Sequence, residues 1–249
     1  MTAPGTASIA ISPAGEVAER AGAVDWHRVA GELDAAGNAV LERLLSPGEC
    51  RDLAGLYPRD DVFRSRIVMA RHGFGRGEYK YFGHPLPPIV AGLRGAMYPH
   101  LAVIANRWHE ALNTGVRFPA DHLDFIGRCH DAGQRKPTPL LLRYDAGDYN
   151  CLHQDVYGEH VFPLQVAILL SEPGRDFTGG EFVMTEQRPR LQSRAEVVPL
   201  RQGDAVVFPV RDRPVRGTRG VYRVNLRHGV SRIRSGRRHT AGIIFHDAA

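Results

Sequence analysis

Short apolar segments, separated by turns at regular intervals, dominate the sequence after Pro137. Each segment is rich in Val, Ile, Leu, Phe or Tyr, and the residues between segments are mostly Gly, Pro and Asp. β-Branched and aromatic residues favour strands, whereas Gly, Pro and Asp favour the turns that join them. Short strands with regular turns are typical of a jelly roll or a β-sandwich. The predicted strands are Leu140–Tyr144, Phe162–Leu170, Gly180–Thr185, Glu196–Leu200, Ala205–Val210, Tyr222–Arg227 and His239–Phe245.

The first half of the chain has apolar residues at helical spacing instead. This spacing predicts a layer of helices, joined by one short strand at Ala39–Leu44. Ser46 and Glu49 flank Pro47 in the pattern of a capping box, which predicts the start of a helix. Residues 1–23 have no sustained period, and we expect them to form a flexible tail. The other predicted helices are Val24–Ala36, ended by Gly37, then Pro87–Leu112 and His122–Cys129.

These patterns together predict an α+β fold that is mainly β, with a double-stranded β-helix (jelly-roll) core and an N-terminal helical layer. We expect one domain over residues 24–249. Within it, residues 24–137 would form the helical support and a lid, and residues 138–249 would form the jelly-roll core. No internal repeat or low-complexity linker separates these halves.

The composition of the chain indicates its cellular compartment and the charge of its binding partner. The net charge is +5, and lysine occurs only at Lys80 and Lys136 among 32 basic residues. Arginine suits carboxylates and phosphates, so this bias fits an anionic partner as well as a general compositional preference. Three cysteines without paired spacing, no signal-peptide pattern and no apolar run near the roughly 20 residues of a membrane span predict a cytoplasmic protein without membrane contact. The sequence leaves the oligomeric state open.

His153 and Asp155 form the most informative short motif, because side chains two residues apart in a strand point the same way. His228 lies on a distant predicted strand, which a roll of antiparallel strands could bring beside them. Two imidazoles and one carboxylate can hold one face of an Fe(II) ion and leave its other positions open. Without the downstream residues, the pair would be read as a surface turn with a local hydrogen bond.

The sequence around both ligand groups resembles the 2-oxoglutarate- and Fe(II)-dependent oxygenases, most closely the prolyl-4-hydroxylase-like branch. The matching segments, which read LLLRYDAGDYNCLHQD and YRVNLRHGVSRIRSGRRHTAGIIF, belong to a resemblance over residues 138–247. It implies that the His153, Asp155 and His228 side chains bind iron. It also implies that Arg238 binds the far carboxylate of 2-oxoglutarate, with Arg237 as its rival, and that Tyr144 and Thr240 lie near this cosubstrate.

The same resemblance implies a dioxygenase that uses Fe(II), 2-oxoglutarate and O2, with ascorbate as a reductant, and releases succinate and CO2. Hydroxylation of a protein or peptide side chain is the favoured reaction. Two departures weaken the transfer of a prolyl substrate. The stretch 166–170 is wholly aliphatic where many protein prolyl hydroxylases carry a tyrosine, and Arg238 stands where collagen-type enzymes tend to use lysine.

The Arg64–His84 segment supports an alternative substrate, because it interleaves basic and aromatic residues. Such a pattern can bind single-stranded nucleic acid, so the alternative activity is oxidative demethylation of alkylated bases. The preferred interpretation of this segment is a lid loop over any substrate. A non-enzymatic, cupin-like metal-binding protein is a third hypothesis, which would leave Arg238 without a purpose. Among the other histidines, His160 is either close to the site or structural, and His239 is expected to be packed.

Overall fold

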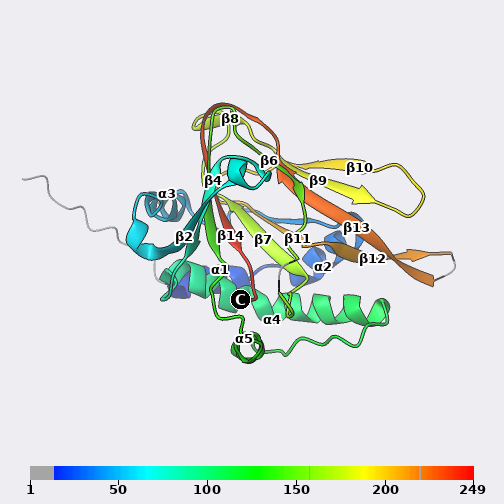
Figure 1. The fold of residues 1–249 in the computed structure, drawn as a ribbon. Coiled ribbons are helices and arrows are strands. Elements are labelled where there is room, and N and C mark those ends of the chain that lie inside the picture. The colour runs from blue at the N-terminus through cyan, green and yellow to red at the C-terminus, as the bar shows by residue number, and fades with distance from the viewer. Residues whose placement is uncertain (1–13, 157, 219) are drawn as a thin grey trace, which may run out of the picture.

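The computed structural model describes residues 14–156, 158–218 and 220–249. Its helices form one layer against two antiparallel β-sheets (Figure 1). This confirms the expected mainly β jelly-roll fold, although the sheets of the described residues do not close into a barrel. The helices are α1 (Ala14–Gly22), α2 (Trp26–Ala36), α3 (Pro47–Gly55), α4 (Pro88–Ala111) and α5 (His122–Asp131), with short 3-10 turns η1 (Asp60–Val62) and η2 (Met69–Arg71).

The large sheet has the strand order β1-β11-β7-β14-β5-β4-β2, with β8 paired to β14. The small sheet has the order β10-β9-β13-β6-β3, with β12 paired to β13. Pairs of β9 with β10 and of β12 with β13 project from one side of the molecule (Figure 1). The strands are β1 (Ala39–Leu41), β2 (Phe63–Val68), β3 (Gly75–Arg76), β4 (Glu78–Phe82), β5 (Leu140–Asp145), β6 (Tyr149–His153), β7 (Leu164–Leu169), β8 (Phe177–Gly179), β9 (Phe182–Gln187), β10 (Arg194–Val198), β11 (Ala205–Pro209), β12 (Asp212–Gly217), β13 (Gly220–Val230) and β14 (Ile233–Ile243).

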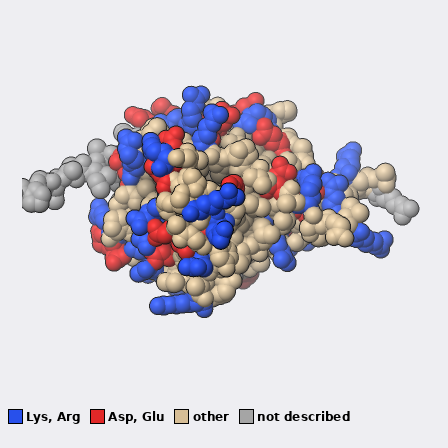
Figure 2. Space-filling model, turned by 90° about the horizontal axis from the view of Figure 1, so that it is seen from above, with Lys and Arg blue, Asp and Glu red and all other residues tan. Residues whose placement is uncertain are grey.

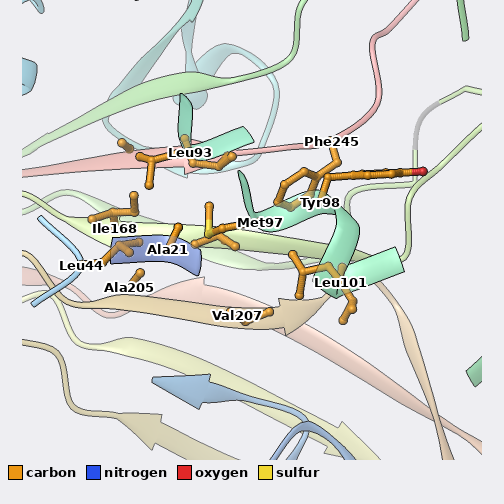
Figure 3. Packing of buried hydrophobic residues seen from close by; sticks show 14 of the residues in the cluster. Ala21, Leu44, Leu93, Met97, Tyr98, Leu101, Ile168, Ala205, Val207 and Phe245 are labelled. Carbon is orange, nitrogen blue, oxygen red and sulfur yellow. The ribbon is translucent and has the colours of Figure 1, made fainter. Parts of the chain in front are cut away.

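Helix α4 covers the outer face of the large sheet. Its Leu93, Met97 and Leu101 side chains are fully buried against strand residues such as Ile168 and Val207 (Figure 3). Burial of each such side chain contributes about 1.5–3 kcal/mol. The other face of the large sheet packs on the small sheet through a second apolar cluster. The large sheet is therefore the middle layer, and alternate residues of its strands face either the helices or the small sheet.

The predicted helix boundaries follow from local chemistry that needs no tertiary contact. Gly37 has a φ of 80° and its N–H donates to the Leu33 carbonyl, so glycine ends α2 in the left-handed conformation. At the start of α3, the Ser46 side chain accepts from the Glu49 N–H, and Glu49 accepts from the Ser46 N–H. Both predicted caps are confirmed.

The prediction of a flexible tail over residues 1–23 is wrong for its second part. Residues 14–22 form helix α1, in which Val17 and Ala21 are fully buried in the main core. Arg20 also anchors this helix by an ion pair with the buried Glu49 carboxylate at 2.5 Å. The segment is amphipathic, but the Ala, Gly, Ser, Thr and Pro content of residues 1–23 led to the prediction of a tail. Residues 1–13 lie outside the described part of the chain.

The first half of the chain is also less helical than expected. Strands β2 and β4, from the segment anticipated as a lid loop, pair with each other and extend the large sheet beyond β5. Residues 231–232 join β13 to β14, and Gly236 lies inside β14 next to a bulge. No helix of the described residues is long and apolar enough to cross a membrane.

Candidate metal centre

Three donor side chains meet between the two sheets. His153 ends β6 and pairs directly with His228 on β13, and Asp155 follows two residues after His153. One ligand atom from each residue lies within 4.8 Å of the others. The structure therefore brings together the three residues that the sequence motif singled out, although they come from segments some 75 positions apart.

The distances leave these donors facing one common point. Nε2 of His153 lies 3.5 Å from Oδ1 of Asp155, and Nε2 of His228 lies 3.4 Å from Oδ2. The two imidazole centroids are 4.2 Å apart. Gln154 points the other way, where its amide donates to the Leu226 carbonyl at 2.7 Å. This alternation is what the strand geometry predicted.

Hydrogen bonds prepare the donors for a cation. The Nδ1 atom of His153 lies 2.8 Å from the Cys151 carbonyl, which can only accept, so Nδ1 carries a proton and Nε2 is the ring atom placed to bind a metal. Burial lowers the pKa of His228, which favours its neutral form. Burial opposes ionisation of Asp155, but side-chain hydrogen bonds from His228 and Gln165 hold the pKa of Asp155 well below its usual value. Two neutral imidazoles and one carboxylate fit Fe(II).

Arg238 is a buried cation on the same side of the large sheet. Its side chain is 1% exposed and donates to Thr240 Oγ1, and its guanidinium carbon lies 5.7 Å from the Tyr144 ring centroid. Within the described residues, no carboxylate lies within 4.0 Å of it, and its Nε has no hydrogen-bond partner. Burial lowers the pKa of Arg238 to about 10, so it stays charged. A buried, unpaired cation is costly unless an anion completes the site.

Arg237 lies on the opposite side of β14. Its Nε donates to Asp145 Oδ1 at 2.6 Å, and its side chain is 58% exposed. The structure thus puts Arg238 inside and Arg237 outside. Gly180 makes room for this arrangement, because a Cβ there would lie 3.1 Å from Cδ of Arg238 and only 2.2 Å from Ile233.

One cavity of about 440 Å³ joins the three donors to Arg238, Tyr144 and Thr240. The cavity lies against the face of the large sheet that is turned away from α4. Residues of β2 and β4 line one side of it, which we call its mouth. The lining residues outside the predicted site include Arg64, His72, Phe74, Tyr81, Thr138, Asn150, Gln165 and His246. The cavity therefore has room for a small anion beside Arg238 and for part of a larger molecule.

Gln165 and His246 are site residues that the sequence did not single out. Gln165 is a buried amide within the apolar β7 strand, and its Nε2 donates to Asp155 Oδ2 at 2.9 Å. One polar residue in an otherwise apolar strand was the available signal. His246, near the end of the sequence, also lines the cavity but is not grouped with the three donors.

Two other histidines take structural positions. His160 exchanges backbone hydrogen bonds with the Gln134 amide and is not among the described residues that line the cavity. His239 packs edge-on against Tyr57 with ring centroids 5.8 Å apart, as the sequence led us to expect. Burial lowers the pKa of His239 to about 4.

Comparison with known proteins identifies the family. Residues 77–248 match the Oxygenase-NA family, described as an oxygenase catalysing oxidative methylation of damaged DNA. Two uncharacterized proteins of Mycobacterium tuberculosis, one from each of two strains, are 51% identical over 168 residues, which cover 68% of this chain and 72% of each relative.

Solved structures share the fold at low sequence identity. An oxidoreductase of the 2OG-Fe(II) oxygenase family from Burkholderia pseudomallei is 15% identical with a TM-score of 0.52, over 91% of this chain and 94% of the other. A prolyl 4-hydroxylase from Phytophthora capsici, also 15% identical, has a TM-score of 0.51 over 100% of this chain and 68% of its own. The chain therefore belongs to the Oxygenase-NA family, within the superfamily of 2-oxoglutarate- and Fe(II)-dependent oxygenases.

Proposed function

We propose that this oxygenase binds Fe(II) through His153, Asp155 and His228, binds 2-oxoglutarate through Arg238, and oxidises the methyl group of an alkylated nucleic-acid base. One observation carries the proposal: a three-donor cluster and a buried arginine without a counter-ion share a single cavity. Oxygenase chemistry needs both features, whereas a cupin-like metal-binding protein would have no need of the arginine.

The chain's own side chains would prepare the metal position. The Cys151 carbonyl holds the His153 ring, and the Gln165 amide holds one oxygen of Asp155. Such outer hydrogen bonds orient metal ligands and raise their affinity. When bound, Fe(II) together with 2-oxoglutarate would supply the means to activate O2 for attack on a C–H bond.

Arg238 would pair with the 5-carboxylate of 2-oxoglutarate. Its Nε is free for an acceptor, and Thr240 already fixes one of its terminal nitrogens. Tyr144 forms a buried wall beside the guanidinium. Charge-assisted hydrogen bonds are strong where water is excluded, so this end of the cavity suits a carboxylate.

The overall reaction would consume one O2 and one 2-oxoglutarate and yield succinate, CO2 and a hydroxylated substrate. One oxygen atom ends in succinate and the other in the new hydroxyl group. If the oxidised carbon is a methyl group on a base nitrogen, the hydroxymethyl product releases formaldehyde and leaves the unmodified base. Ascorbate would act as a reductant that maintains Fe(II).

The mouth of the cavity favours a nucleic-acid substrate over a peptide. Arg64 lies over the Tyr81 ring with its guanidinium carbon 4.4 Å from the centroid, and its Nε donates to the Pro137 carbonyl. His72 and Phe74 stack with centroids 5.3 Å apart at the same mouth. Planar rings beside a cation can stack a base and attract a phosphate. The family description, which names damaged DNA, supports the same choice.

Not every basic residue of the Arg64–His84 segment is free for this role. Arg66 is paired with the Glu78 carboxylate, and the buried Lys80 is paired with Asp60. Arg64 is the basic residue of this segment that lines the cavity. Elsewhere, basic side chains are spread over the face seen in Figure 2 and are mixed with acidic ones, so the surface offers scattered phosphate contacts rather than one uniform patch.

Spectroscopy and product analysis test the proposal. Anaerobic addition of Fe(II) and 2-oxoglutarate should produce a visible charge-transfer band, and the wild type should release succinate with or without ascorbate. His153→Ala and Asp155→Ala should abolish both signals, while His160→Ala, outside the cavity, serves as the matched control. Retained turnover in either ligand variant would mean that other residues bind the metal.

The substrate is tested by a panel of methylated single-stranded oligonucleotides, unmodified oligonucleotides and proline-containing peptides. Formaldehyde release should accompany succinate only with methylated oligonucleotides. Stimulation by peptides alone would reject the nucleic-acid substrate and leave the oxygenase activity intact.

A further inference from the structure

We infer that His246 is a substrate-reading residue: its Nε2–H donates to a neutral carbonyl oxygen of the base whose methyl group is oxidised. This inference rests on the proposed nucleic-acid activity. His246 follows the last strand of the large sheet, lines the cavity and is 4% exposed.

The protonation of His246 is set by its backbone surroundings. The N–H of Phe162 points at Nδ1 of His246 over 3.2 Å. Since a backbone N–H can only donate, Nδ1 must be the acceptor, and the proton of the neutral ring is on Nε2. Among the described residues, no hydrogen bond is made to Nε2. A buried ring thus has a donor with no protein partner, which suits a bound molecule.

Several contacts hold His246 in place. The Thr138 hydroxyl donates to the His246 carbonyl oxygen. On either side, the Arg94 guanidinium donates to the Ile244 carbonyl at 2.8 Å and to the Asp247 carboxylate at 2.7 Å. The ring is therefore preorganised, and little side-chain entropy would be lost on binding a ligand.

The position of His246 is on the substrate side of the metal centre. Arg238, Thr240 and Gly242 on β14 line the cavity. His246, which follows the end of this strand, lines the same cavity. Strands β14 and β7 are antiparallel, and Ile243 pairs with Val166. Gln165, whose amide donates to Asp155, precedes Val166 and therefore lies closer to the His246 end of the sheet. The metal centre thus separates the cosubstrate end at Arg238 from the end at His246.

The His246 end of the cavity suits a neutral hydrogen-bond acceptor of the substrate better than a phosphate. Burial, reinforced by the charge of Arg94, lowers the pKa of His246 to about 4, so the ring is uncharged near neutral pH. A neutral donor at a water-poor site pairs best with a carbonyl oxygen. Among methylated purines, 1-methylguanine offers a carbonyl oxygen next to the methylated nitrogen, whereas 1-methyladenine has an amino group there.

Two oligonucleotides that differ only in 1-methylguanine or 1-methyladenine are the probes. The wild type should show a kcat/KM about 2- to 10-fold higher for 1-methylguanine, in line with one net hydrogen bond. The difference should lie mainly in KM, measured by formaldehyde and succinate release.

Variants of His246 separate substrate reading from a structural role. The amide nitrogen of His246→Gln reaches about as far as Nε2, so this variant should keep the preference although it loses the acceptor for Phe162. His246→Asn can retain that acceptor through its oxygen but has a shorter reach, so it should lose the preference, as should His246→Phe. A purely structural role predicts the reverse order, with Asn closer to wild type than Gln in both activity and thermal stability.

His122→Asn is the matched control, because His122 bonds the Phe245 carbonyl but is outside the cavity lining. It should leave the ratio of the two substrates unchanged. An active wild type without the preference, or variants in the reverse order, would overturn the role of His246 alone. A wild type that acts on no methylated oligonucleotide would overturn the proposed substrate and this inference with it.

Discussion

The side-chain nitrogen of Gln165 lies 2.9 Å from Oδ2 of Asp155, so a strand of the large sheet orients a carboxylate that follows a strand of the small sheet. This contact joins the two sheets at the candidate metal centre. It also explains why a buried amide interrupts an apolar strand.

Gln165→Leu should weaken metal binding more than it weakens the fold. Loss of the hydrogen bond frees Asp155 to rotate, and such outer partners typically contribute about 10–100-fold in metal affinity. Titration with Fe(II) under anaerobic conditions measures the effect. Gln202→Leu, which removes an amide bonded to the Leu170 carbonyl away from the cavity, is the control. Equal affinities for the two variants would show that Asp155 does not depend on Gln165.

Arg238→Ala should lower the affinity for 2-oxoglutarate by about 10- to 150-fold, because a charge-assisted contact contributes about 1.5–3 kcal/mol. Arg237→Ala is a close control, since Arg237 is exposed and bonded to Asp145 on the opposite side of the strand. The 2-oxoglutarate dependence of the charge-transfer band reports binding directly. A stronger loss in the Arg237 variant would reverse the assignment.

Arg64→Ala should weaken binding of single-stranded DNA and make it less sensitive to salt. Each phosphate contact contributes about −0.7 to the slope of log K against log salt for single strands. Filter binding over a range of salt concentrations should therefore give a slope less steep by roughly that amount. Arg28→Ala, on α2 and paired with Glu32, should leave the slope unchanged. An unchanged slope for Arg64→Ala would remove this residue from the proposed interface.

Asp247→Asn should destabilise the protein by about 3–5 kcal/mol near neutral pH, because it leaves the buried Arg94 without its counter-charge. Burial opposes ionisation of Asp247, but the Arg94 charge and the His130 hydrogen bond hold its pKa below the usual 3.8. A depressed pKa stabilises the fold above the unfolded pKa, and this stabilisation is lost as pH falls through the folded pKa.

Urea unfolding at several pH values tests that linkage. The gap in the free energy of unfolding between wild type and Asp247→Asn should be constant above about pH 5 and should shrink below pH 4. A gap that stays constant down to pH 3 would indicate that the ion pair is not the source of the difference.

Local patterns were sufficient for much of the fold. The capping box at Ser46 and the glycine cap at Gly37 depend on contacts between near neighbours in the sequence. The strands after Pro137 were predicted from the local alternation of apolar segments and turn residues. Helix α1 was missed because only two of its side chains, Val17 and Ala21, are buried hydrophobic residues, and they are buried by distant parts of the chain. Strands β2 and β4 were missed for a similar reason, since they join the large sheet through β5, which comes about 60 residues later in the chain.

The sequence by itself predicted the donor set, because His153, Asp155 and His228 are chemically suited to one metal and lie in segments that resemble the oxygenase family. It also narrowed the cosubstrate cation to Arg237 or Arg238. Only the tertiary structure decided which arginine faces inward, which amide orients Asp155 and which histidine, His246, has a free donor in the cavity. Those choices depend on sheet register and burial, which join residues far apart in the chain and cannot be decided from local sequence alone.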